Sequence, residues 1–164
     1  MRGAVGGVPL NVSLRPVSAL DLPTIDRWAS TVADHMSRTR PYAEGADRHD
    51  SDSGLYWYVI AADGREVGTV WLELLSAASE AVLGIFLGDP SYFDRGIGRA
   101  AIALAVAEFR RAHREAPIVL RVRRSNDRAI ACYRRAGFTV TGGGSKSLPS
   151  GEAVPYCRMV CLPC

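Results

Sequence analysis

The chain has 164 residues, of which 48% are hydrophobic and 23% charged, and its formal net charge is +3. This length fits one domain with a substantial core and is too short for two domains of ordinary size. The small charge and the lack of a basic tract with aromatic residues argue against a nucleic-acid partner, and no apolar run approaches the ~18 residues of a membrane span.

The ends of the chain carry little chemistry. Residues 1–10 lack the apolar core of a signal peptide, so we expect a flexible tail, a single domain over residues 11–164, and a cytoplasmic location. Cys157, Cys161 and Cys164 crowd the C-terminus without a second ligand pair at matching spacing. We therefore expect reduced thiols and no metal site.

Hydrophobic patterns predict the elements of the first half in chain order. A strand over residues 12–17 precedes a helix through Ile25 and Trp28, with Asp21 ahead of Pro23 marking its start. The polar stretch 31–54 is predicted to hold a second short helix and a mobile loop, with His35 and His49 exposed.

Three antiparallel strands follow in the prediction. Residues 56–62 and 66–75 alternate around a hairpin turn at 62–65, and residues 80–88 form the third strand. A tight loop with Gly96 and Gly98 then leads into an alanine-rich helix over 97–113. A helix N-terminus leaves its first N–H groups unpaired, and glycines let a phosphate approach them, so this loop predicts an anion site.

The second half begins with a strand over 118–123, whose Arg121, Arg123 and Arg124 we interpret as a solvated strand end. A helix follows, and Gly137 is predicted to be its left-handed cap, with Phe138 folding back on Tyr133. The prediction then gives a strand over 138–141, a glycine-rich loop over 142–151 and a last strand over 154–161. The whole predicts an α/β (α+β) fold, a mixed, mostly antiparallel sheet of about seven strands flanked by about four helices.

Two segments together resemble the GNAT family of N-acetyltransferases. They are the glycine loop and the run Asn126-x-x-Ala129-x-x-x-Tyr133-x-x-x-Gly137-Phe138. Phe93, at the first position of the loop motif, is similar to the branch that acetylates ribosomal proteins, polyamines and some aminoglycosides.

The resemblance implies that acetyl-CoA is the acyl donor. It assigns the pyrophosphate to the loop, the pantetheine arm to the free edge of the preceding strand, and protonation of the departing thiolate to Tyr133. The donor-binding residues that it implies are Ile85, Phe86, Leu87, Arg95, Gly96, Ile97, Gly98, Arg99, Ala100 and Asn126. Gly84 and Gly88 would permit the strand to splay. Cys132 lies about 100° around the helix from Tyr133, which disfavours covalent catalysis.

The general base is less defined by the sequence. Many relatives carry a Glu where this chain has Val82, and Glu80, one step earlier on the same strand face, is our first candidate. Glu73, Asp89 and a water relayed to a carboxylate are alternatives. The acids of the polar stretch are predicted to attract a cationic acceptor; they are Glu44, Asp47, Asp50 and Asp52.

The predicted reaction is direct attack of a primary amine on the thioester in a ternary complex. The acceptor stays open between a small amine, polyamine-like or aminoglycoside, and a protein N-terminus, and a homodimer also stays open. The alternative is an acyl-CoA-binding sensor or structural module without turnover, which the replacement of the common Glu by Val82 keeps under consideration.

Overall fold

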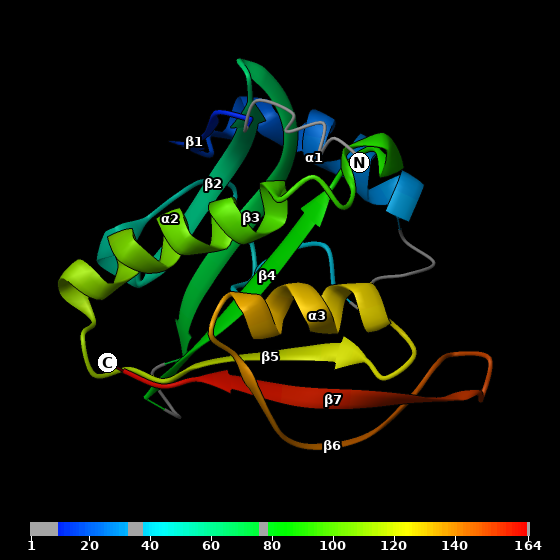
Figure 1. Cartoon of the computed structure of the whole chain (residues 1–164). Coiled ribbons are helices and arrows are strands. Elements are labelled where there is room, and N and C mark those ends of the chain that lie inside the picture. The colour runs from blue at the N-terminus through cyan, green and yellow to red at the C-terminus, as the bar shows by residue number, and fades with distance from the viewer. Residues whose placement is uncertain (1–9, 33–37, 76–78, 164) are drawn as a thin grey trace, which may run out of the picture.

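The structure is a computed structural model and describes residues 10–32, 38–75 and 79–163. These residues form a seven-stranded sheet with the strand order β1-β2-β3-β4-β5-β7-β6, flanked by three α-helices (Figure 1). The expected α/β class and the mostly antiparallel sheet are confirmed. In the described part of the chain no helix is long and apolar enough to cross a membrane.

The strands and helices follow one another in an order close to the prediction. They are β1 (Val12–Pro16), α1 (Leu22–Val32), β2 (Leu55–Ala62), β3 (Arg65–Leu75), β4 (Glu80–Leu87), α2 (Ile97–Ala112), β5 (Ile118–Arg123), α3 (Asp127–Arg135), β6 (Thr139–Ser147) and β7 (Ala153–Cys161). Short 3-10 turns cover Ala19–Asp21, Ser51–Ser53 and Pro90–Tyr92.

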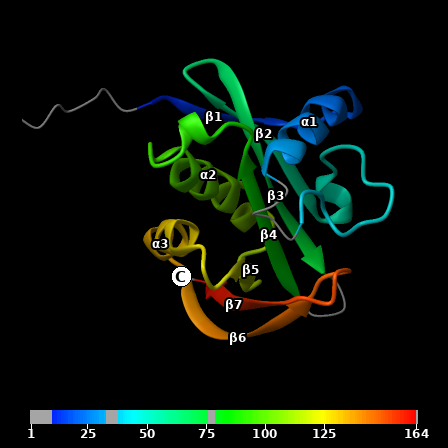
Figure 2. The ribbon, with the colours of Figure 1, turned by 90° about the vertical axis from the view of Figure 1, so that its right-hand side faces the viewer.

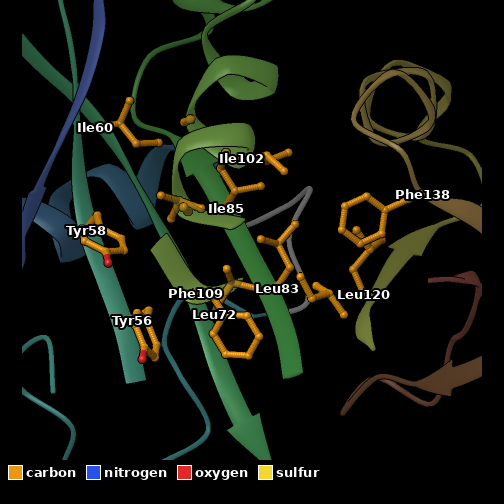
Figure 3. Close-up of a cluster of buried hydrophobic side chains, with 14 of the residues drawn as sticks. Tyr56, Tyr58, Ile60, Leu72, Leu83, Ile85, Ile102, Phe109, Leu120 and Phe138 are labelled. Atoms are coloured by element: carbon orange, nitrogen blue, oxygen red, sulfur yellow. The ribbon is translucent and has the colours of Figure 1, made fainter. Parts of the chain in front are cut away.

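Helices cover the two faces of the sheet unequally. α2 and α3 lie on one face, which we call the α2 face, and α1 with residues 38–54 lies on the other, the α1 face (Figure 2). Alternate residues of each strand therefore point into two cores. The larger core, on the α2 face, joins strand residues such as Tyr56 and Leu83 to Phe109 of α2 (Figure 3). The smaller core packs Trp57, Trp71 and Phe86 against α1.

One junction in the sheet differs from all the others. β4 and β5 run parallel and pair only at Ala81↔Ile118 and Val82↔Val119, whereas the other neighbouring strands are antiparallel. Beyond Val82 the two strands diverge (Figure 1). We call the space between them, after these two pairs, the β4–β5 opening.

The helix cap predicted at Gly137 is confirmed. Gly137 has φ 99°, its N–H bonds the carbonyl of Arg134 at 3.1 Å, and the Phe138 N–H bonds that of Tyr133 at 3.0 Å. This is the Schellman arrangement, and the rings of Phe138 and Tyr133 pack edge to face, 6.2 Å apart. The cap fixes the last turn of α3 and, with it, the position of the Tyr133 ring.

Two predictions about this architecture need correction. The glycine-rich stretch after residue 141 is not a loop, because β6 continues to Ser147 and pairs with β7. Gly143 allows this pairing, since a Cβ there would lie 2.4 Å from the Tyr156 carbonyl oxygen. The described residues hold three α-helices where four were expected, and between α1 and β2 they show a 3-10 turn. Residues 1–9, most of the expected tail, and His35 lie outside the described residues.

Candidate active site

A cavity of about 490 Å³ lies where β4 and β5 separate. Ile85, Phe86 and Leu87 line one side of it. The end of β5, the loop before α2, the first turns of α2, one side of α3 and Val32 of α1 line the rest. Ile85 and Leu87 belong to the core on the α2 face, whereas Phe86 belongs to the core on the α1 face. The cavity is therefore bounded by side chains from both faces of the sheet.

Most of the residues predicted to hold the donor line this one cavity. The lining includes Ile85, Phe86, Leu87, Gly96, Ile97, Gly98, Arg99, Asn126 and Tyr133. It does not include Arg95, Ala100 or Glu80. Arg95 is exposed with its guanidinium 5.6 Å from the Tyr92 ring, and the Ala100 N–H already bonds the Gly96 carbonyl at 3.1 Å.

The loop before α2 has the geometry of an anion site. Gly96 is the N-cap in a left-handed conformation with φ 78°, and no acidic residue occupies the first turn of α2. A Cβ on Gly98 would have only the Cys132 sulfur near it, at 3.6 Å, so this side of the helix faces the cavity. The first N–H groups of α2 are thus accessible to a phosphate.

Guanidinium groups dominate the charge of the lining. Arg99, Arg121, Arg123, Arg128 and Arg135 line the cavity, against the single carboxylate of Asp94. Arg121 is exposed and Arg123 half-buried at the end of β5, as expected for a solvated strand end, and both also line the cavity.

Arg128, on the first turn of α3, was not singled out from the sequence. Its guanidinium carbon lies 3.8 Å from the centroid of the Phe93 ring, in cation–π geometry. Phe93, the residue that departs from the common family motif, thus connects the glycine loop to α3.

Asn126 and Tyr133 both reach the cavity from α3. The Asn126 Oδ1 accepts the Ala129 N–H at 3.2 Å, so this residue caps the helix and also lines the cavity. Tyr133 is half-buried, and burial raises the pKa of its phenol well above the ordinary value of 10.0. The phenol is therefore protonated at neutral pH, which is the state that a general acid needs.

Cys132 also lines the cavity, although the helix turns it away from Tyr133. Burial raises the pKa of its thiol above the ordinary value of 9.0. The neutral thiol is a poor nucleophile, so the structure gives no reason to invoke covalent catalysis.

The candidate bases lie apart from Tyr133. Glu80, at the start of β4, forms an ion pair with Arg158 at 3.1 Å. Glu73 is buried, and its two oxygens accept the N–H groups of Tyr42 and Ala43 at 2.6 and 2.7 Å. Its carboxylate therefore anchors the segment that covers the α1 face.

Asp89 is exposed and caps the turn that follows β4. Its Oδ1 accepts the Ser91 N–H at 2.8 Å, and this bond lowers the pKa of the Asp89 carboxyl below its ordinary value. Asp50 and Asp52, expected near the acceptor, belong to the turn before β2, where Asp50 accepts the Ser53 N–H. None of these three acids lines the cavity.

His49 is half-buried, although it was expected to be exposed. Its Nδ1 accepts the Trp57 N–H at 3.1 Å, and its ring packs on Tyr56 and Tyr58. Burial lowers the pKa of His49, which favours the neutral ring that this bond requires.

Gly84 and Gly88 have a steric role that the sequence did not reveal. A Cβ on Gly84 would lie 2.1 Å from the ring of Trp71, and one on Gly88 would lie 2.1 Å from the ring of Trp28. The two glycines therefore make room for indole rings on the α1 face.

The fold and the cavity define an acyltransferase-like domain, and comparison with known proteins gives its family. A sequence model of the Acetyltransferase (GNAT) family matches residues 22–138, which is more than half of the chain. The chain belongs to this family, whose enzymes are N-acetyltransferases that use acetyl-CoA as the donor.

The individual proteins that match this chain are only distantly related to it. A mycothiol acetyltransferase of Propionibacterium freudenreichii is 35% identical over 88 residues, which are 53% of this chain and 24% of that protein. The chain thus spans about a quarter of that relative.

Among solved structures, the aminoglycoside acetyltransferase AAC(6')-Ib with coenzyme A has a TM-score of 0.71 at 19% identity, covering 93% of this chain and 95% of that one. The dodecameric spermidine N-acetyltransferase of Vibrio cholerae also has a TM-score of 0.71, at 20% identity over 92% and 93% of the two chains. These structures share the fold.

Proposed function

We propose that this chain moves the acetyl group of acetyl-CoA to a primary amine by direct attack in a ternary complex. The amine belongs to a small molecule or to a protein N-terminus. The observation that carries the proposal is a single cavity at the β4–β5 opening that brings together the loop before α2, Asn126 and Tyr133.

The residues of the cavity fit each part of the proposed donor. The first N–H groups of α2 and the guanidinium of Arg99 suit the pyrophosphate, and Arg128 and Arg135 add positive charge on α3. The edge of β4 beyond Val82 has no strand partner among the described residues. Its peptide groups at Ile85 to Leu87 suit the amide-rich pantetheine arm, which can pair with them like a strand.

Tyr133 is the proposed general acid. Its protonated phenol would give its proton to the sulfur as the C–S bond breaks. An alkylammonium near pKa 10.4 must first lose a proton, which costs about 4–5 kcal/mol at pH 7, at about 1.4 kcal/mol per pH unit. Glu80 remains the proposed base. Because Glu80 does not line the cavity and is paired with Arg158, the proton would reach it through water.

The test is release of the CoA thiol from acetyl-CoA across a panel of primary amines. We expect acceptor-dependent thiol release, with an acetylated product detected by mass spectrometry and no acetylated enzyme when the acceptor is omitted. An enzyme that binds acetyl-CoA but releases no thiol with any amine would contradict the proposal.

A binding module without turnover is the second candidate. It is favoured by Val82, which stands where the resemblance to the family implies a carboxylate, and by the ion pair that engages Glu80. Such a module would bind acetyl-CoA in calorimetry and release no thiol, so the same panel distinguishes the two functions.

A further inference from the structure

The loop before α2 brings no cation of its own to the cavity. Its lining residues are aromatic, acidic or glycine: Tyr92, Phe93, Asp94 and Gly96. Arg95 does not line the cavity, and its guanidinium lies 5.6 Å from the Tyr92 ring. The Asp94 carboxylate repels an anion. A phosphate bound to the first N–H groups of α2 therefore takes its compensating positive charge from another element.

Helix α3 supplies such a charge directly beside the loop. The guanidinium carbon of Arg128 lies 3.8 Å from the centroid of the Phe93 ring, which places it over the face of that ring. Arg128 lines the cavity, and it forms no ion pair or side-chain hydrogen bond with any described residue. The aromatic face does not neutralise the guanidinium, so the charge and the N–H donors of Arg128 are available to an anion.

Two more guanidiniums lie around the same part of the cavity. Arg128, Cys132 and Arg135 are spaced by four and three residues on α3, so they share one side of that helix. Gly98 of α2 faces Cys132, because a Cβ on Gly98 would lie 3.6 Å from the Cys132 sulfur, and Arg99 is the next residue. Burial raises the pKa of the Cys132 thiol, and the positive charges of three arginines oppose that rise: Arg135, Arg99 and Arg128. All three charges are therefore close to one point between α2 and α3.

No described carboxylate neutralises this cluster. Arg99, Arg128 and Arg135 form no ion pair with a described residue, and neither does Asp94, the single carboxylate of the cavity lining. Like charges repel, so the cluster becomes more favourable when an anion lies among the three guanidiniums. The donor carries two anions of this kind, its pyrophosphate and the 3′-phosphate of its ribose, and a guanidinium pairs with phosphate oxygens through two N–H groups.

Resting on the proposed function, we infer that Arg128 binds a phosphate of the donor and that Phe93 is a positioning residue, which holds the Arg128 guanidinium at the cavity before the donor arrives. An arginine side chain on a helix surface samples many rotamers, and ordering it during binding costs entropy. Contact with the Phe93 ring restricts those rotamers in advance. The ring at position 93 thus contributes to donor affinity through Arg128 and not through a polar group of its own.

Calorimetric titration with CoA, which requires no turnover, tests the role of Arg128. Arg128→Gln should raise the CoA dissociation constant about tenfold. The matched control is Arg134→Gln, which removes the same charge from an exposed position of α3 outside the cavity lining and should change the affinity by less than about twofold. Unchanged affinity in Arg128→Gln, or an equal loss in Arg134→Gln, would overturn the inference.

Dephospho-CoA, which lacks only the 3′-phosphate, distinguishes the two phosphates of the donor. A loss of affinity in Arg128→Gln that occurs with CoA and not with dephospho-CoA would assign Arg128 to the 3′-phosphate. An equal loss with both compounds would assign it to the pyrophosphate. Either result supports a phosphate contact by Arg128.

A double-mutant cycle tests the positioning role of Phe93. Phe93→Leu keeps an apolar side chain but removes the ring, so it should raise the CoA dissociation constant about threefold in the wild-type background and have no effect in the Arg128→Gln background. Phe93→Tyr keeps the ring and should retain wild-type affinity. Equal losses from Phe93→Leu in both backgrounds would show that the ring acts on the loop and not on Arg128, and would overturn the positioning role.

These binding measurements separate the inference from the proposed function. CoA binding that depends on Arg128, without thiol release across the amine panel, would support the inference while overturning the proposed function. Turnover together with wild-type CoA affinity in Arg128→Gln would overturn the inference alone. A wild-type protein that does not bind CoA would overturn both.

Discussion

Replacing Tyr133 by Phe tests the proposed acid while leaving the fold intact. The hydroxyl makes no hydrogen bond with any described residue, and the ring contact with Phe138 does not depend on it. We therefore expect the free energy of unfolding to change by less than about 0.5 kcal/mol. Turnover should fall roughly 10- to 1000-fold, or about 1.4–4 kcal/mol of activation free energy, since a thiol is already a tolerable leaving group.

The pH dependence adds a second check on Tyr133. A general acid is protonated, and so able to donate, at pH values below its pKa. Because burial raises the pKa of the Tyr133 phenol, the wild-type acid stays protonated from about pH 6 to 9. The loss in Tyr133→Phe should thus be constant over that range. Initial rates at saturating donor, under conditions where chemistry limits the rate, measure it, and acetyl-CoA affinity serves as the control. Full turnover of the variant would show that the hydroxyl has no catalytic role.

Three further changes address the donor loop, the α1-face packing and a surface ion pair. Gly98→Val should raise the acetyl-CoA dissociation constant at least tenfold, about 1.4 kcal/mol, in calorimetry, because its side chain would enter the cavity; unchanged affinity in a folded variant would place the donor elsewhere. Gly84→Ala should destabilise the protein by about 1–3 kcal/mol in urea unfolding, because the buried Trp71 ring must move, and wild-type stability would refute this packing. The guanidinium of Arg15 lowers the pKa of Asp21 to about 2 from its ordinary 3.8, so this carboxylate stabilises the fold above about pH 4 and the gain disappears as the pH falls toward 2. Asp21→Asn should flatten the fall of Tm over that interval, and parallel Tm curves would exclude the linkage.

The parts of the fold that short-range patterns define were predictable. The hairpin between β2 and β3, the loop before α2 and the cap at Gly137 each depend on residues a few positions apart. Asn126 and Tyr133 share a helix, so their spacing alone aims both toward one side of it. Most of the predicted site residues line the cavity, but it was the resemblance to the family, and not these local rules alone, that assigned them to the donor site.

What was missed depends on pairs far apart in the sequence. Glu80 and Arg158 are separated by 78 residues, and no local pattern shows that one neutralises the other. In the sequence, Gly84 suggested only a position where the strand could splay. The strand register, which the sequence does not show, pairs Gly84 with Trp71 and explains why no side chain fits there. The second half of β6 was predicted as a loop, because glycine is disfavoured in strands. In the structure the backbone of β7 lies so close to Gly143 that a side chain would not fit there.

The two-pair junction between β4 and β5 has a consequence for the lifetime of the protein. Strands β1 to β4 and strands β5, β7 and β6 form two sub-sheets, and this short ladder is the backbone pairing that joins them among the described residues. A donor arm lying along the free edge of β4 would bind only the folded chain, so mass action would stabilise the fold by about 2.7 kcal/mol at a donor concentration of about 100 times its dissociation constant. Resistance to proteolysis would then rise and fall with the supply of acetyl-CoA, and the abundance of the enzyme would be coupled to the metabolic state that feeds its reaction.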